Sequence, residues 1–299
     1  MSHTTDEITS QPRCWEHALR RLPSFEQALP AKGERVAVLG CGTSLFMAQS
    51  YATLREERGH GITDAFPASE HRADRGYDRI VALTRSGTTT EILTALTSLA
   101  SPARITVITA VPDSPAAALA DDVVCLDHAD ERSVVQTRFP TTVMTLLRAH
   151  LGLSITEAAE DVATALALPL PEQLTAAGQI TFLGAGWTIG LAHEAALKVR
   201  EAAGHWTESY GAMEYRHGPI AVARAGRAVW SLSPVESALA AQVLATGAAL
   251  RQPTLDPLAE LVLAQRLAVR LAESAGRDPD RPRHLTRSVV LTPETRSAI

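Results

Sequence analysis

The chain has 299 residues, of which 45% are hydrophobic and 20% charged, and its formal net charge is -5. This length can bury a substantial core, and the acidic balance lacks the basic excess that non-specific binding to nucleic acid requires. Three cysteines without a CxxC pair argue against a disulfide framework and a zinc site, so a reducing cytoplasm fits best. The polar N-terminus has no apolar signal region and no stretch suits a bilayer span, which indicates neither export nor membrane insertion.

Short β-branched or apolar runs alternate with longer segments of helical periodicity along the chain. The runs that predict strands lie at residues 35–39, 79–83, 105–109, 123–126, 179–183 and 228–232. The segments that predict helices lie at residues 45–57, 90–99, 141–151, 189–203 and 257–275. This alternation is typical of βαβ units around a mostly parallel sheet.

Two prolines in residues 166–171 interrupt this pattern and predict a boundary between two lobes. We expect an N-terminal helical or extended segment over residues 1–30, a first domain over 31–165 and a second domain over 172–299. Residues 38–44 and 182–188 each contain a strand end, a glycine turn and a helix start, which suggests a duplicated unit.

The first candidate site is the turn at residues 40–44, Gly-Cys-Gly-Thr-Ser. Glycines let backbone N–H groups approach an anion, and the start of the following helix adds partial positive charge. Thr43 and Ser44 are therefore candidate phosphate ligands. Both residues are also good helix N-caps, and that structural role explains the motif equally well when it stands alone.

The next predicted strand is followed by residues 83–91, Leu-Thr-Arg-Ser-Gly-Thr-Thr-Thr-Glu, a segment dense in hydroxyl groups. Hydroxyl donors beside main-chain amides suit a phosphate dianion. The candidate ligands are Thr84, Arg85, Ser86 and Thr89. A helix capping box with Ser86 or Thr88 as the cap is the alternative, but two such turns after successive strands favour a phosphate site. Because the P-loop and dinucleotide motifs are missing, a small phosphorylated ligand is preferred to a nucleotide.

A third polar group lies on the predicted helix 189–203, where Glu194, Lys198 and Glu201 share one face. Such charges usually form solvated ion pairs, but the rest of this helix is apolar, which also fits a charged face in a cleft. Downstream, His217 precedes a Gly-Pro turn and is either a surface residue or a titrating group. Proton transfer between sugar carbons needs a carboxylate base and ring opening needs a group that titrates near neutrality, roles that suit Glu201 and His217.

Four motifs in this order resemble one family, the SIS-domain phosphosugar isomerases. This family includes the isomerase half of glucosamine-6-phosphate synthase and the tagatose-6-phosphate ketose/aldose isomerase group. The matching stretches are residues 41–44, 86–89, 194–201 with 216–219, and 278–289. The resemblance implies an α/β fold of two SIS-type lobes, each a mostly parallel sheet flanked by helices in three α-β-α layers.

The resemblance also implies a role for each matching position. The residues that would hold the sugar phosphate are Thr43, Ser44, Thr84, Arg85, Ser86 and Thr89. Glu201 would be the base that moves a proton between C1 and C2, and His217 would assist ring opening. In the synthases this histidine comes from the neighbouring subunit, so a homodimer with shared active sites is implied. Residues 134–137 resemble the loop that closes on the sugar, and Val134 and Lys198 are possible substrate contacts.

Three features depart from the pattern of this family. Arg287 stands where the synthases carry a lysine that can form a Schiff base, and arginine cannot form that imine, although it can hold an anion or a hydroxyl. The glutaminase domain is missing, so a glutamine amidotransferase is not expected. The second lobe is short between residues 233 and 257, which predicts a reduced sheet.

The sequence thus predicts an enzyme that isomerises, or deaminates with isomerisation, a hexose or aminohexose 6-phosphate without a metal or organic cofactor. Deglycation of a fructosamine 6-phosphate uses the same enolisation and stays open. The competing class is a non-catalytic module that senses a sugar phosphate and regulates a partner. Retention of Glu201 and His217 favours catalysis, whereas Arg287 keeps the sensor open. The expected partners are the sugar phosphate and a second copy of the chain.

Overall fold

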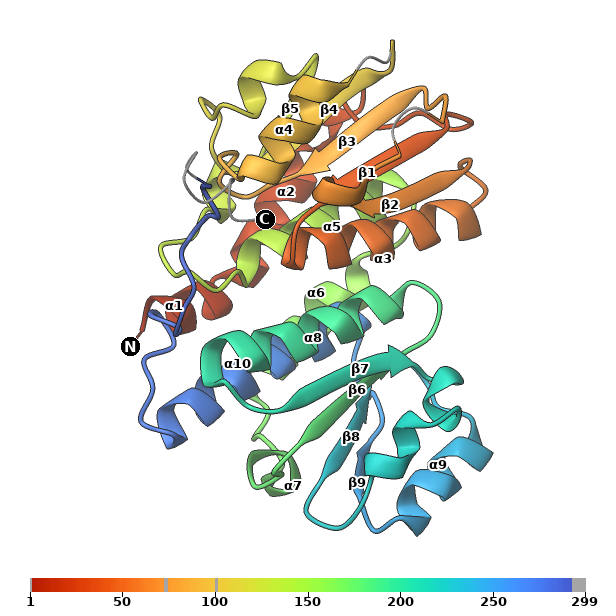
Figure 1. Cartoon of the computed structure of the whole chain (residues 1–299), viewed down its shortest axis with the longest axis vertical. Helices are drawn as coiled ribbons and strands as arrows, with labels where there is room; N and C mark the ends of the chain where they lie inside the picture. The colour runs from red at the N-terminus through yellow and green to blue at the C-terminus, as the bar shows by residue number, and fades with distance from the viewer. Residues whose placement is uncertain (1, 73–74, 100–101, 292–299) are drawn as a thin grey trace.

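The computed structural model describes residues 2–72, 75–99 and 102–291, which form two lobes, each built on a parallel sheet (Figure 1). The first sheet has five strands in the order β2-β1-β3-β4-β5. Its strands are β1 (Val36–Gly40), β2 (Thr63–Pro67), β3 (Arg79–Leu83), β4 (Arg104–Thr109) and β5 (Asp122–Cys125). Strands β1 and β3 are buried along their whole length, as continuous apolar runs in a parallel sheet usually are.

The second sheet has four strands in the order β7-β6-β8-β9, and all of its pairs are parallel. Its strands are β6 (Ile180–Gly184), β7 (Thr207–Gly211), β8 (Ala228–Ser231) and β9 (Ala249–Arg251). The segment between residues 233 and 257, predicted to be short, contains one helix and the three-residue strand β9. The predicted α/β class with two mostly parallel sheets is confirmed.

Helices cover both sheets, and side chains that alternate along each strand meet helices on opposite faces. In the first lobe, Val36 and Val38 pack with α3 and α5, whereas Ala37 and Leu39 pack with α4. The helices are α1 (His3–Thr9), α2 (Gln11–Phe25), α3 (Thr43–Glu57), α4 (Thr90–Ser98), α5 (Arg138–His150), α6 (Thr156–Ala167), α7 (Glu172–Thr175), α8 (Thr188–Ala203), α9 (Ser237–Ala245) and α10 (Pro257–Ser274). Short 3₁₀ segments are η1 (Ala68–Glu70), η2 (Ala117–Leu119), η3 (Asp127–Ala129), η4 (Glu214–Arg216) and η5 (Pro219–Val222).

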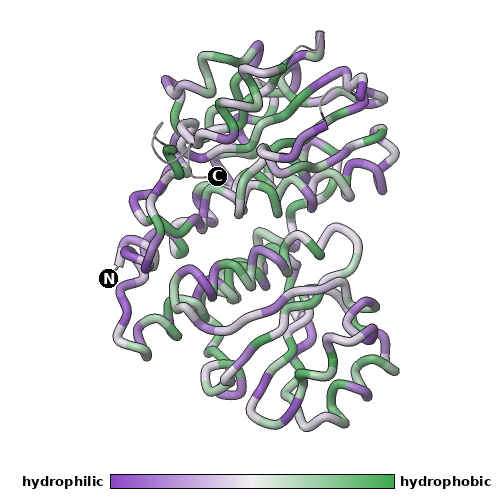
Figure 2. Tube along the Cα trace, in the orientation of Figure 1, coloured by the Kyte–Doolittle hydropathy of each residue, from purple (hydrophilic) through white to green (hydrophobic). Residues whose placement is uncertain are grey.

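The lobes meet where α3 packs against α8, and one apolar core runs from the first sheet through these helices to α10. Figure 2 shows hydrophobic residues recurring along the strands and along the helices between the two sheets. The contact is close at Gly190, where an added Cβ would lie 2.3 Å from the carbonyl oxygen of Phe46. A larger residue would push α8 away from α3, so this glycine sets how closely the lobes approach.

After α10 the chain turns back toward the first lobe as a C-terminal tail, which we define as residues 277–291 (Figure 1). Asp280 in this tail accepts hydrogen bonds from the backbone of His3 and Thr4 at the start of α1. The N-terminal helices and the tail are thereby joined on one side of the molecule. Within the described residues, no helix combines the length and the apolar character that a bilayer span requires.

Candidate functional site

The two hydroxyl-rich turns lie side by side because β1 and β3 are neighbours and end at the same edge of the sheet. Ser44 follows β1, whereas Thr84, Ser86 and Thr89 follow β3, and all four line one cavity of about 30 Å³. Arg85 and Arg287 complete its wall together with Cys41, Leu83, Ile92 and Gln136. Residues predicted separately from two motifs therefore share a single hollow, which we call the hydroxyl cavity.

The second turn keeps its shape because Gly87 has a conformation that other residues rarely adopt. Its φ is +65°, and an added Cβ would lie 2.0 Å from Oγ of Ser114. Oγ1 of Thr84 accepts a hydrogen bond from the N–H of Gly87 at 3.2 Å. Thr84 thus shapes the turn from within, while the hydroxyl of Ser86 is left to face the cavity.

Arg85 was predicted to help hold the phosphate, and its buried head joins three segments around the cavity. The guanidinium donates to the carbonyl oxygens of Ser133 at 3.1 Å and Arg287 at 2.8 Å. It also lies 3.6 Å from the buried carboxylate of Glu131. Burial raises the pKa of Glu131, an effect that the positive charge of Arg85 opposes. This geometry fixes the tail and the loop at residues 131–134 to the phosphate turn.

The C-terminal tail covers the hydroxyl cavity with a hydroxyl group of its own. Oγ of Ser288 lies 3.1 Å from Oγ of Ser86, 2.9 Å from Oγ1 of Thr88 and 3.4 Å from Oγ1 of Thr89. The N–H of Thr90 donates to the carbonyl oxygen of Val289 at 3.1 Å, which anchors the tail to the start of α4. Ser288 is thus a further member of the hydroxyl cluster.

Arg287, at the position where a lysine was expected, points away from the hydroxyl cluster. Its guanidinium donates to the carbonyl oxygen of Glu131 at 3.1 Å and to the carboxylate of Asp130. The arginine thereby ties the tail to the loop that follows η3. Arg287 still lines both cavities of the site.

A second cavity of about 170 Å³ adjoins the first, and we call it the carboxylate cavity because Glu201 lines it. Cys41, Thr89, Gln136 and Arg287 line both cavities, so the two adjoin and share one wall. The other residues around the carboxylate cavity are Gly42, Thr43, Val134, Lys198, Leu285, Thr286, Ser288 and Val289. The structure therefore brings the predicted base, the predicted phosphate residues and the possible substrate contacts Val134, Lys198 and Arg287 to two adjoining cavities.

The charged face of α8 is buried, so it is not the solvated ion-pair face that was the alternative prediction. Nζ of Lys198 lies 2.5 Å from Oε2 of Glu201, 3.4 Å from Oε1 of Glu194 and 2.9 Å from Oγ1 of Thr43. Lys198 and Glu194 are almost completely buried, whereas the side chain of Glu201 is 20% exposed. Glu201 is thus the carboxylate of this network that a ligand in the cavity can reach.

Burial sets the protonation of this network. Burial raises the pKa of Glu194 from 4.5 to about 8, although the charge of Lys198 opposes the shift. For Lys198, burial lowers the pKa, but the carboxylates of Glu194 and Glu201 outweigh it and raise the pKa overall. Lys198 therefore stays protonated, and its shortest contact is with Glu201. The ammonium of Lys198 thereby holds the carboxylate of Glu201 at the wall of the carboxylate cavity.

His217 is exposed and lies in the loop between η4 and η5, away from the two cavities. The end of β7 contacts the start of α8, where an added Cβ on Gly211 would lie 3.6 Å from Cδ1 of Ile189. Glu201 lies in the last turn of α8, about 18 Å further along at 1.5 Å per residue. A single chain thus places the predicted base and the predicted ring-opening group at opposite ends of one helix.

Sequence reasoning missed several residues around the site, including Cys41, Gln136 and Ser288. Burial raises the pKa of Cys41 to about 11, so its thiol is protonated and is no nucleophile at neutral pH. Ser288 directly follows Arg287, which the sequence analysis had singled out in the matching stretch 278–289. The hydroxyl group of Ser288 could therefore have been predicted to lie at the site. Gln136 lies in the loop matched at residues 134–137 and had no distinguishing pattern.

The comparisons with known proteins agree with this geometry. The family model of the SIS domain matches residues 31–151, which confirms the resemblance inferred from the four motifs. The glutamine–fructose-6-phosphate aminotransferase (isomerizing) of Sulfurisphaera tokodaii is 29% identical over 333 residues. That alignment covers 95% of this chain and 56% of the relative, so the chain spans little more than half of its length.

Solved structures resemble nearly the whole chain. Glucosamine-6-phosphate deaminase from Thermotoga maritima has a TM-score of 0.80 at 26% identity, covering 97% of this chain and 100% of its own. Tagatose-6-phosphate ketose/aldose isomerase from Escherichia coli has a TM-score of 0.81 at 18% identity, covering 98% and 97%. At 18% identity, the likeness to this isomerase concerns the fold alone. The homologous proteins support an enzyme of the phosphosugar isomerase type, while the substrate and the reaction belong to the proposal below.

Proposed function

We propose that this protein is an enzyme that binds a hexose or aminohexose 6-phosphate and either isomerises it between aldose and ketose or deaminates it with isomerisation. The observation that carries the proposal is that the hydroxyl cavity and the cavity that Glu201 lines adjoin and share one wall. A ligand held by its phosphate at one end would therefore reach a carboxylate with its other end.

In this proposal the phosphate dianion is held by the hydroxyls of Ser44, Ser86 and Thr89 and by the backbone amides at the start of α3 and α4. Hydrogen bonds to a charged group are stronger than neutral ones, and helix N-termini add favourable partial charge. Thr43, Thr84 and Arg85 support these groups. Because Ser288 now occupies the hydroxyl cluster, the tail must shift or share its hydrogen bonds when the phosphate binds.

Glu201 is the proposed base. In the open-chain aldose its carboxylate would take the proton from C2 and return it to C1, while the proton of the C2 hydroxyl passes to the oxygen on C1. The carbonyl thereby moves from C1 to C2 with no net gain or loss of protons or electrons. Lys198, 2.5 Å from Glu201, would hold the carboxylate in position for this step.

His217 is proposed to assist ring opening in a site shared between two copies of the chain. The separation of His217 from Glu201 along α8 supports a homodimer in which each histidine serves the other copy's cavity. The proposal also treats the lobes as a duplicated three-layer unit with a reduced second sheet. It further assigns the protein to the cytoplasm, since free cysteines suit a reducing compartment. The domain limits 31–165 and 172–299 belong to the same proposal.

A non-catalytic sensor of sugar phosphates is the second candidate, favoured by Arg287 in place of an imine-forming lysine. Deuterium exchange separates the two. We expect C1 or C2 of a hexose 6-phosphate to exchange with solvent deuterium in the presence of the protein. Glu201→Gln should abolish this exchange while hexose 6-phosphates, but not the free hexoses, still raise the melting temperature. Binding without exchange in the unaltered protein would support the sensor, and equal thermal shifts with free sugars would refute the phosphate anchor.

A further inference from the structure

Gln136 differs from the other residues at the wall that the hydroxyl cavity and the carboxylate cavity share. The residues that line both cavities are Cys41, Thr89, Gln136 and Arg287. The hydroxyl of Thr89 already contacts that of Ser288 at 3.4 Å. The guanidinium of Arg287 donates to the carboxylate of Asp130. Oε1 of Gln136, by contrast, is buried and has no hydrogen-bond partner in the described part of the chain.

A buried amide oxygen without a partner indicates which kind of group belongs beside it. Nearly all buried polar groups in folded proteins have a hydrogen-bond partner, and an exception at a cavity wall points to a ligand or a water. Oε1 of Gln136 is an acceptor, so it needs an O–H or N–H donor. A phosphate dianion offers acceptors alone, whereas a sugar hydroxyl can donate. Gln136 therefore suits the sugar part of a ligand and not its phosphate.

The loop that carries Gln136 is held in place on both sides of this residue. The carboxylate of Glu131 accepts a hydrogen bond from Oγ1 of Thr137 at 2.8 Å. The guanidinium of Arg85 donates to the carbonyl oxygen of Ser133 at 3.1 Å. Because the backbone is already ordered, a ligand that contacts Gln136 loses little of its binding free energy to ordering the loop.

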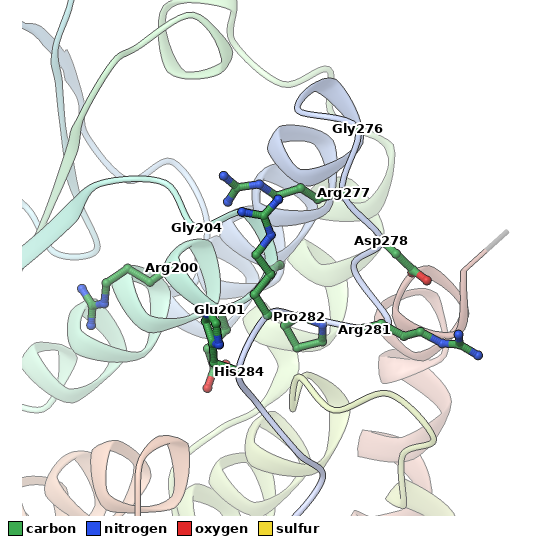
Figure 3. A pocket seen from close by; sticks show the side chains of 11 residues that line it. Arg200, Glu201, Gly204, Gly276, Arg277, Asp278, Arg281, Pro282 and His284 are labelled. Carbon is green, nitrogen blue, oxygen red and sulfur yellow. The ribbon is translucent and has the colours of Figure 1, made fainter.

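The two ends of the candidate site define what would pass Gln136. Figure 3 shows Glu201 in the last turn of α8, near the tail at Pro282 and His284, with which it lines a further cavity. The next residues of the tail, 285–289, line the carboxylate cavity. A sugar with its phosphate in the hydroxyl cavity and its reacting carbons beside Glu201 would therefore pass the shared wall, and Gln136, with the middle of its chain.

We infer that Gln136 is a specificity-determining residue, whose amide oxygen accepts a hydrogen bond from the hydroxyl on C4 of a hexose 6-phosphate. The inference rests on the proposed function, because the phosphate anchor fixes which carbon lies at the shared wall. C4 and C5 lie in the middle of the chain between phosphorus and C2. In a ketose 6-phosphate the oxygen on C5 closes the ring, so the hydroxyl on C4 is the one that can donate in both the ring and the open form.

The test compares fructose 6-phosphate with its 4-deoxy and 3-deoxy analogues by calorimetric titration. The 4-deoxy compound should bind the unaltered protein roughly fivefold more weakly than fructose 6-phosphate, the effect of one neutral hydrogen bond. Gln136→Met keeps a side chain of similar size without the amide. This variant should bind fructose 6-phosphate and the 3-deoxy compound roughly fivefold more weakly, and the 4-deoxy compound as tightly as the unaltered protein does.

Gln173→Met makes the same replacement on the exposed helix α7 and should leave all three affinities unchanged. Equal affinity of fructose 6-phosphate and the 4-deoxy compound for the unaltered protein would overturn the inference and leave the proposed function standing. This comparison needs no variant, so it holds even if Gln136→Met does not fold. Equal weakening of all three ligands by Gln136→Met would also overturn the inference, because Gln136 would then act through shape. If fructose 6-phosphate and both analogues failed to bind, the proposed function would fail, and the inference with it.

Discussion

Replacing Glu194 by glutamine should make the protein more stable at alkaline pH, because the native carboxyl holds a proton that the unfolded chain releases. Glu194 is completely buried, and its Oε2 has no hydrogen-bond partner in the described structure. Its folded pKa of about 8 lies above the ordinary value of 4.5. The folded state therefore favours the neutral form, and glutamine mimics that form in shape and hydrogen bonding.

The sign and size of this difference in the free energy of unfolding follow from the proton that the folded protein retains. Between pH 4.5 and about 8 the folded protein retains a proton that the unfolded chain has lost, so each rise of one pH unit lowers the free energy of unfolding by about 1.4 kcal/mol. Glu194→Gln removes this dependence. The variant should thus gain stability over the unaltered protein as pH rises, reaching on the order of 4 to 5 kcal/mol near pH 8 and staying constant above it.

Urea unfolding of both proteins at several pH values between 5 and 9 measures this difference directly. Glu157→Gln, on the exposed face of α6, is the matched control and should show no pH-dependent difference. If the stability curves of Glu194→Gln and the unaltered protein ran parallel over this range, the buried carboxyl would be charged and the reasoning would be wrong.

Three further predictions concern the turn, the buried ion pair and the tail. In denaturant unfolding, Gly87→Ala should lower the free energy of unfolding by about 1 to 2 kcal/mol because of the positive φ, and by about 1 to 3 kcal/mol more because of contact with Ser114. Gly152→Ala, also at positive φ but in open space, should show only the first of these losses. Arg85→Met should lower the free energy of unfolding by about 3 to 5 kcal/mol because it leaves Glu131 buried without its counter-charge. Adding Glu131→Gln should restore much of this free energy, and no recovery would refute the pairing. Ser288→Ala should speed hydrogen exchange of the amide at Leu291 about fivefold, while Ser274→Ala should not.

The central strands and the edge strand β5 could be predicted from the sequence, but the other three edge strands could not. Central strands such as β1 and β3 are buried on both faces and read as unbroken apolar runs. The strands that were missed, β2, β7 and β9, all lie at an edge of their sheet and are mostly half-buried. Their sequences mix polar and apolar residues, so periodicity alone gives no strand signal.

The phosphate turns could also be predicted, because adjacent parallel strands bring their carboxyl ends to one edge regardless of detail. The direction in which each side chain points could not be predicted from the sequence. Arg85 contacts backbone carbonyls of the tail and the 131–134 loop, and these lie 48 and more residues away in the chain.

The proposed function requires a sugar phosphate to bind across the hydroxyl and carboxylate cavities. A crystal structure with fructose 6-phosphate should place the phosphate among the hydroxyls of Ser44, Ser86 and Thr89, with C1 and C2 beside the carboxylate of Glu201. A phosphate bound elsewhere, with the hydroxyl cavity still filled by Ser288, would contradict the proposed function.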